Sequence, residues 1–144
     1  MTATIFLVED NPADVELFRM ALQEASLECE LVLFEDGRKF LDYIDSAESQ
    51  VALPDLLILD LNLPKNDGAE ILRVLSGIPH FASVPVAVLS SSSSSRERSK
   101  LANYRVREFI SKPSDLESYM KIGQIISGLL LRSDSHDQHN ALHK

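Results

Sequence analysis

The stretch ATIFLVEDNPAD, residues 3–14, joins an apolar run to the start of a helix. Its first six residues are mostly β-branched, aromatic or aliphatic, which is typical of a strand buried on both faces. Asn11 can cap a helix, Pro12 suits the first helical position, and Asp14 places negative charge in the first turn. Apolar residues then recur at helical spacing up to residue 25. The segment therefore predicts a strand followed by an amphipathic helix.

The same alternation of a short apolar run with a longer amphipathic stretch occurs about five times along the chain. The other apolar runs are ELVLF (30–34), LLIL (56–59), VAVL (86–89) and FI (109–110). Strands that alternate with helices form βαβ units, which build a parallel sheet with helices on both faces. We therefore predict an α/β fold with a doubly wound, five-stranded parallel sheet.

The C-terminal part of the chain predicts one last helix and then a tail. Ser114 is expected to cap that helix, whose apolar residues continue to about residue 131. Its apolar positions between 125 and 131 are wider than one buried stripe needs, so part of them could form a partner or dimer surface. Residues 1–131 are expected to form one domain, and residues 132–144, where apolar periodicity stops, a flexible polar tail.

Composition excludes several classes of protein. The chain has 144 residues, of which 44% are hydrophobic and 25% charged, so one folded domain is expected rather than disorder. Its net charge of −8 repels phosphate backbones and argues against binding of nucleic acid. Cys29 has no second cysteine with which to pair, which fits a reducing compartment. Because no apolar run reaches the length of a membrane span and no signal peptide precedes the first strand, we expect a cytoplasmic protein without membrane attachment.

Polar residues that can bind a ligand or take part in a reaction follow four of the five predicted strands. Glu9 and Asp10 come after the first strand, Asp60 after the third, Ser90 after the fourth and Lys112 after the fifth. In an open parallel sheet the carboxyl ends of the strands meet at one edge, and ligands bind there. Acids at strand ends also serve as helix caps, and Lys-Pro often forms a turn. A set of five such residues at one edge is better explained by a shared site.

The chemistry of this set suggests a cation and a phosphoryl group. Three close carboxylates cannot all stay ionised without a strong counter-charge, and Mg²⁺ prefers oxygen ligands of this kind. A cation and a lysine together attract a phosphoryl group. A carboxylate beside them can act as the nucleophile and form an aspartyl phosphate. Asp60 is the best candidate because it lies at a strand end, central among the other groups.

Four sequence blocks closely resemble the receiver domain of response regulators. They are LVEDNPAD (7–14), LILDLNLPKNDG (57–68), PVAVLS (85–90) and ISKP (110–113). The resemblance extends over about residues 4–131 and implies the flavodoxin-like (βα)5 receiver fold. The first two blocks are most similar to stand-alone receivers that serve phytochrome-type histidine kinases. The resemblance thus implies a single-domain response regulator of a two-component phosphorelay.

The resemblance also implies a role for each site residue. Asp60 would accept the phosphoryl group from a phosphohistidine of a sensor kinase. The side chains of Glu9, Asp10 and Asp60, with the backbone carbonyl of Asn62, would hold Mg²⁺. No further cofactor is implied.

The remaining implied roles concern the switch that follows phosphorylation. Ser90 would donate its hydroxyl to the phosphoryl group, Lys112 would pair with its charge, and Phe109 would be the aromatic switch. Pro113 would follow a cis peptide bond. Phosphorylation would then shift the population of a two-state element.

Partners and alternatives follow from the same comparison. The expected partners are a sensor histidine kinase, in particular a phytochrome, and a downstream protein, phosphotransfer protein or second copy of the chain. One alternative is a Mg²⁺-dependent phosphatase with an aspartate nucleophile, but such enzymes need a second aspartate two residues later, where this chain has Asn62. Another is a receiver-like module that binds partners without phosphorylation. The complete set of acids, hydroxyl and lysine argues against that module, and we do not expect an enzyme.

Overall fold

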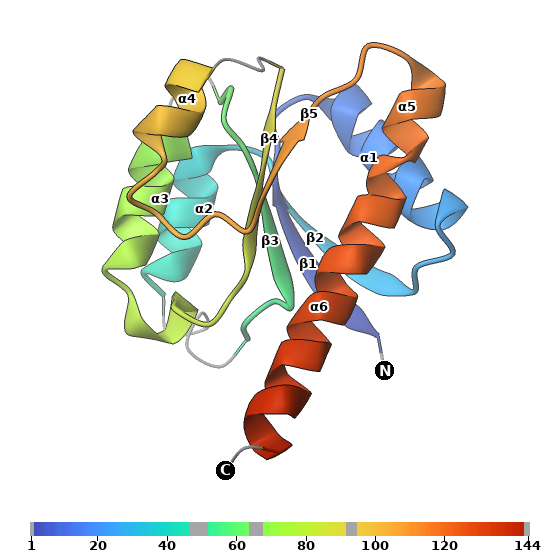
Figure 1. Ribbon diagram of the computed structural model, residues 1–144. Coiled ribbons are helices and arrows are strands. Elements are labelled where there is room, and N and C mark those ends of the chain that lie inside the picture. Colours follow the sequence, from blue (N-terminus) through green and yellow to red (C-terminus); the bar gives the residue numbers. More distant parts are fainter. Residues whose placement is uncertain (1, 47–51, 64–67, 92–94, 143–144) are drawn as a thin grey trace.

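The computed structural model describes residues 2–46, 52–63, 68–91 and 95–142 (Figure 1). In chain order, its elements are β1 (Ala3–Val8), α1 (Pro12–Glu24), β2 (Cys29–Phe34), α2 (Gly37–Ile44), β3 (Leu56–Asp60), α3 (Gly68–Ser76), the 3-10 turn η2 (Pro79–Phe81), β4 (Val86–Ser90), α4 (Ser95–Lys100), β5 (Glu108–Ser111), α5 (Leu116–Met120) and α6 (Ile122–Leu142). The strands form one parallel sheet in the order β2-β1-β3-β4-β5. The predicted doubly wound, five-stranded parallel sheet is confirmed.

The strand order sets the position of the site. Figure 1 shows α2, α3 and α4 on one face of the sheet and α1, α5 and α6 on the other. After β1 the chain goes first to β2 on one side and then to β3 on the other, so the order reverses around β1. In open parallel sheets, the carboxyl ends of the strands next to such a reversal form the ligand-binding edge. Here that edge lies at the ends of β1 and β3.

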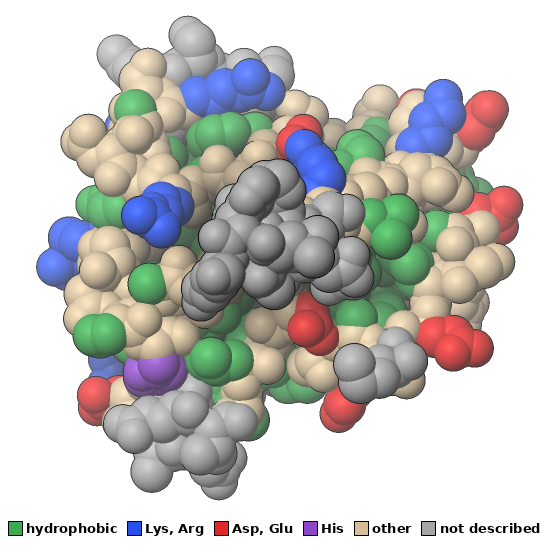
Figure 2. All heavy atoms as spheres, turned by 60° about the horizontal axis from the view of Figure 1, so that its bottom comes forward, with side chains coloured by type: hydrophobic (Ala, Val, Ile, Leu, Met, Phe, Trp, Pro, Cys, Tyr) green, Lys and Arg blue, Asp and Glu red, His purple; other side chains and the backbone are tan. Residues whose placement is uncertain are grey.

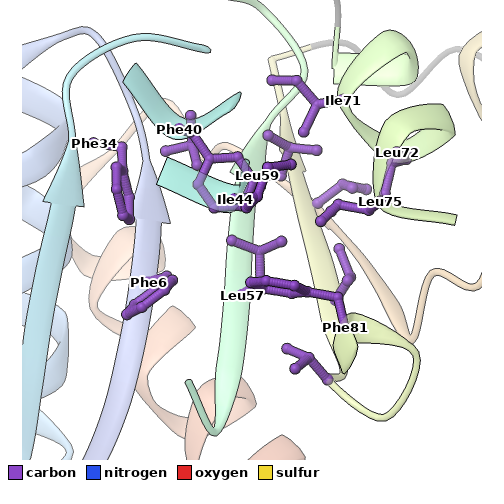
Figure 3. Close-up of a cluster of buried hydrophobic side chains, with 14 of the residues drawn as sticks. Phe6, Phe34, Phe40, Ile44, Leu57, Leu59, Ile71, Leu72, Leu75 and Phe81 are labelled. Atoms are coloured by element: carbon purple, nitrogen blue, oxygen red, sulfur yellow. The ribbon is translucent and has the colours of Figure 1, made fainter. Parts of the chain in front are cut away.

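One layer of the core fills the space between the sheet and α2, α3 and η2 (Figure 3). Alternate residues of β1 point to opposite faces, and Phe6 and Val8 belong to this layer. The Phe6 and Phe34 rings meet edge to face with centroids 5.3 Å apart, and Phe34 meets Phe40 in the same way at 5.1 Å. Aromatic pairs of this geometry add to the burial of apolar area.

The second layer packs α1, α5 and α6 against the other face of the sheet. The approach of α6 to α1 is so close that a Cβ atom at Gly123 would overlap the backbone carbonyl oxygen of Ala21. Of the residues expected to form a partner surface, Ile126 and Leu129 are fully buried in this layer, whereas Ile125 and Leu131 are exposed. Two of the five apolar residues in that set are therefore core, and Leu130 is half-buried against it.

The C-terminal region differs from the prediction in three ways. Asp115, not Ser114, caps α5, and its carboxylate accepts a hydrogen bond from the amide of Ser118. A turn at Lys121 then separates α5 from α6. The helix α6 continues to Leu142 through the segment that we expected to be a tail. That segment lacks an apolar stripe, so backbone hydrogen bonds propagating from the packed part of α6 account for the extension.

Two further findings concern the backbone and the helices. Among the described residues no peptide bond is cis, so the cis bond expected before Pro113 is not present. The two isomers of a bond before proline differ by only about 0.5–1 kcal/mol, so sequence alone does not fix the choice. In the part of the chain that the structure describes, none of the helices combines the length and apolar character needed to cross a membrane.

Candidate functional site

Three carboxylates meet where β1 and β3 end. Glu9 and Asp10 follow β1 directly, and Asp60 is the last residue of β3. One carboxylate oxygen from each of the three lies within 4.8 Å of the others. Glu9 and Asp60 are only 2% and 1% exposed, whereas Asp10 is exposed. The site is therefore an anionic cluster of two buried carboxylates and one exposed carboxylate.

Lys112, which follows β5, reaches into this cluster with its ammonium group. Its Nζ atom lies 2.8 Å from Asp60 Oδ2, 2.9 Å from Glu9 Oε2 and 3.1 Å from Asp14 Oδ2. Burial by itself lowers the pKa of Lys112, but the hydrogen bonds to Asp60 and Glu9 raise it well above its usual range. The lysine therefore stays charged and balances part of the negative charge.

Asp14 is a member of the cluster that sequence reasoning missed. The sequence assigned this residue only to the first turn of a helix. Because only three residues separate the end of β1 from the start of α1, the first turn of this helix lies near the same edge of the sheet. The carboxylate of Asp14 thereby reaches Lys112, and its backbone carbonyl accepts a long hydrogen bond of 3.5 Å from the Tyr119 hydroxyl. The sequence signal that could have identified Asp14 is its position in the first helical turn after β1.

The carboxyl of Glu9 is strongly affected by its surroundings. Its pKa is raised from the ordinary value of 4.5 to about 7, chiefly by burial and then by the neighbouring Asp60, against the opposing effect of Lys112. Burial removes the water that stabilises the charged form, and a nearby like charge disfavours it again. A cation that entered the pocket would relieve both effects.

The pKa of Glu9 predicts how stability depends on pH in the absence of divalent cations. A pKa that is higher in the folded than in the unfolded state gives a stabilising contribution that is complete below about pH 4.5 and is lost as the pH rises through about 7. We expect the free energy of unfolding to fall by roughly 1–3 kcal/mol between about pH 5 and pH 8 in chelator. Urea unfolding of wild type and Glu9→Gln measures this fall, and the variant should lack it.

A matched control for this change is Glu16→Gln, since Glu16 is exposed on α1. The control should keep the wild-type dependence on pH. If the free energy of unfolding of Glu9→Gln depended on pH as that of wild type does, another group would be its cause.

Asn62 and Ser91 connect the two loops that flank Asp60. The backbone amide of Asn62 donates to Asp60 Oδ1 at 2.8 Å, and its side-chain Nδ2 donates to Ser91 Oγ at 2.7 Å. Asp60 thus has Oδ1 held by a backbone amide and Oδ2 held by Lys112. Sequence reasoning did not foresee the link between Asn62 and Ser91.

Ser90 and Phe109 lie on the two strands beyond β3. Ser90 is a buried residue at the end of β4, next to β3, and its backbone carbonyl accepts a hydrogen bond from the amide of Lys112 at 2.8 Å. Phe109 is half-buried on β5 and pairs in register with Val88. The guanidinium of Arg98 lies 5.3 Å from the centre of the Phe109 ring, a cation–π contact between α4 and β5. The ring therefore contacts α4 rather than the carboxylates.

The donor set of the pocket fits a hard divalent cation. Glu9, Asp10 and Asp60 offer oxygen atoms only, which suit Mg²⁺ or Mn²⁺ better than a soft metal. Among the described residues, the cluster has four carboxylates, with Asp14 included, and one ammonium, that of Lys112, which contacts three of them. The surplus of negative charge attracts a cation, and the exposed position of Asp10 allows one to reach the site from solvent.

The chain is similar to proteins of known class over most of its length. Residues 5–123 match the response regulator receiver domain. Response regulator Rcp1 of Synechocystis sp. is 32% identical over 133 residues, which cover 90% of this chain and 89% of Rcp1.

Solved structures give the same result. The phosphorylated cyanobacterial phytochrome response regulator RcpA has a TM-score of 0.81 and 34% identity, covering 91% of this chain and 95% of that one. The Mn²⁺-bound form of response regulator Rcp1 has a TM-score of 0.76 and 30% identity, covering 86% and 91%. Fold, acidic pocket and similarity agree, and the chain belongs to the response regulator receiver domain family.

Proposed function

We propose that this receiver accepts a phosphoryl group on Asp60 from a phosphohistidine of a sensor kinase, with Mg²⁺ in the adjacent pocket. The observation that carries the proposal is the buried carboxylate of Asp60, which lies beside Lys112 and within reach of Glu9 and Asp10. Membership of the receiver family implies a histidine kinase as the donor. The Mn²⁺-bound structure of Rcp1 supports a divalent cation for the pocket.

The transfer would form one bond and break another. A carboxylate oxygen of Asp60 attacks the phosphorus, the bond between phosphorus and the imidazole nitrogen breaks, and the nitrogen keeps the electron pair. The backbone amide of Asn62 and the ammonium of Lys112 orient the two oxygens of Asp60. Lys112 would then compensate the charge of the phosphoryl group while Glu9 and Asp14 continue to position it.

Mg²⁺ would be held by the side chains of Glu9, Asp10 and Asp60 and by the backbone carbonyl of Asn62. When bound, the cation supplies positive charge that offsets the charge of the transferred group. The chain's own residues bury the Asp60 carboxylate and fix its orientation before the phosphoryl donor binds.

The signal would leave the site through β4 and β5. The hydroxyl of Ser90, which follows Leu89, the partner of Asp60 in the sheet, would donate to a phosphoryl oxygen. Phe109 would respond on the neighbouring strand, where the contact with Arg98 links it to α4. An added charge of about −2 at Asp60 is a local change that a two-state surface can read out to a downstream protein.

A phosphatase that uses Asp60 as nucleophile is the weaker proposal. Such an enzyme needs a proton shuttle two residues after the nucleophile, and here Asn62 provides an amide, which donates to Ser91. A neutral amide cannot act as a general acid and base near neutral pH. The receiver function needs no such shuttle.

We also propose that the donor is a phytochrome-type histidine kinase, which the similarity to RcpA supports. The test compares phosphotransfer to this protein from an autophosphorylated phytochrome kinase and from a sensor kinase without a phytochrome module. We expect the initial rate from the phytochrome kinase to be roughly tenfold higher or more, since a docking preference of about 1.4 kcal/mol suffices for that ratio.

The two parts of the proposal fail differently in this experiment. Equal rates from both kinases would contradict the pairing with a phytochrome while leaving the role of Asp60 in place. Absence of transfer from both, together with no adduct from a small-molecule donor, would contradict phosphoacceptor function.

A further inference from the structure

A cavity lies at the end of the sheet opposite the acidic pocket. It opens beside Val86, the first residue of β4, whereas Ser90 at the other end of the same strand belongs to the edge with Asp60. Its volume is about 330 Å³, which is within the range of pockets that hold small ligands. The receiver chemistry described above makes no use of this space.

The floor of the cavity is apolar and well ordered by the core around it. Its residues come from α3, from η2 and from the segment that leads into β4, and all are buried: Leu72, Leu75, Phe81, Val84 and Val86. These side chains belong to the core layer shown in Figure 3, so the floor is preformed. A ligand that bound here would bury apolar surface without first ordering the site.

The mouth of the cavity has a different character. Asn103, Tyr104 and Arg105 are three consecutive residues of the segment between α4 and β5, and all three line the opening. Within the described part of the chain, no carboxylate lies within ion-pair distance of Arg105. An amide, a phenol and a guanidinium are therefore placed together at the edge of an apolar floor. This combination is typical of small-molecule sites, in which a few polar groups fix the orientation of an apolar body.

The charges around the mouth indicate the sign of the ligand. Although the protein carries a net charge of −8, Arg105 lines the opening, and two further exposed arginines lie within two residues of lining positions: Arg73 next to Leu72 on α3, and Arg107, whose backbone amide donates a hydrogen bond to the carbonyl of Val86. Figure 2, which brings this end forward, shows Lys and Arg side chains beside hydrophobic ones on the side where α3 lies in Figure 1. A planar guanidinium binds a carboxylate in a bidentate manner.

We propose that this cavity binds a small amphipathic organic anion, with an aromatic or branched aliphatic body on the apolar floor and a carboxylate at Arg105. The apolar floor offers no partner to a sugar or a nucleotide base, and the arginine disfavours cations. Asn103 and Tyr104 provide further hydrogen bonds to the carboxylate from the same edge.

The test uses three probes of one shape: 3-phenylpropionate, neutral 3-phenylpropanol and cationic 3-phenylpropylamine. Titrations of the full chain by two-dimensional NMR measure affinity and location together. We expect 3-phenylpropionate to bind most tightly, with shifts confined to residues 72–86 and 103–107 and absent from the edge that holds Asp60. Equal affinity for all three probes, shifts centred elsewhere or no binding would overturn the proposal.

Two exposed arginines give a matched pair of variants. Arg105→Gln removes the cation at the mouth and should weaken 3-phenylpropionate about fivefold while leaving 3-phenylpropanol unchanged, since a solvent-exposed ion pair contributes up to about 1 kcal/mol. Arg107→Gln makes the same change two residues away, at a position that does not line the cavity, and should weaken 3-phenylpropionate much less than Arg105→Gln does while leaving 3-phenylpropanol unchanged. Equal effects of the two variants would show that general charge attracts the anion and that no site at Arg105 exists.

Ala82→Phe tests the cavity itself. Ala82 is exposed at the rim and lines the opening, so a phenyl ring there should exclude all three probes without disturbing the core. Retention of binding in a folded Ala82→Phe protein would place the site elsewhere.

Discussion

Replacing Asp60 with asparagine is expected to abolish phosphorylation of this protein by acetyl phosphate. In wild type with Mg²⁺, the intact mass should increase by one phosphoryl group, and chelation of the metal should prevent the increase. An amide oxygen is a far weaker nucleophile than a carboxylate and cannot form the acyl phosphate. Because the Asp60 carboxylate is 98–99% buried and held by Asn62 and Lys112, no other acid in the pocket occupies its place.

The variant is expected to stay folded, because it removes one negative charge from a pocket in which carboxylates outnumber the ammonium. Asp42→Asn is the matched control, since Asp42 is exposed on α2 and pairs only with neighbouring Arg38 among the described residues. The control should gain the phosphoryl group as wild type does. A phosphoryl adduct on folded Asp60→Asn would show that another residue is the acceptor. Continuous release of phosphate by wild type over many turnovers would favour the phosphatase.

The sheet and its functional edge were predictable because two simple signals agree. Each strand is a short apolar run that ends abruptly at a polar residue, as LLIL does at Asp60. A parallel sheet then brings all such ends to one edge, whatever their distance along the chain. This is why Glu9 and Lys112, 103 residues apart, could be placed together before their contact of 2.9 Å was known.

Other features depend on how far side chains reach or on how elements pack, and the periodicity of apolar residues does not predict either. The ion pair between Asp14 and Lys112 requires the first turn of α1 to lie over the pocket, and the bond between Asn62 and Ser91 joins two loops with no shared pattern. The turn at Lys121 interrupts a helix whose apolar spacing continues across it. The cavity beside Val86 is likewise a product of how α3, η2 and the α4–β5 segment pack.

Gly123 lies where α6 packs most closely against α1. Gly123→Ala is expected to lower the free energy of unfolding by roughly 1–3 kcal/mol, the usual cost of forcing extra atoms into a packed core. The added methyl group would overlap the Ala21 carbonyl oxygen and would contact the Cβ of Ala25 at 2.9 Å. Backbone atoms of a neighbouring helix cannot rotate away as a flexible side chain can, so α1 and α6 must separate. Urea unfolding measures the change.

Gly128→Ala separates this steric effect from helix propensity. Gly128 lies on the same helix, and a Cβ atom there would meet nothing within 4 Å. Alanine is favoured over glycine in a helix by roughly 0.5–1 kcal/mol, so this variant should be more stable than wild type. Replacing glycine with alanine should therefore lower the free energy of unfolding at position 123 and raise it at position 128. If both variants were stabilised, the close approach of α6 to α1 would not exist in solution, because propensity alone would then account for both results.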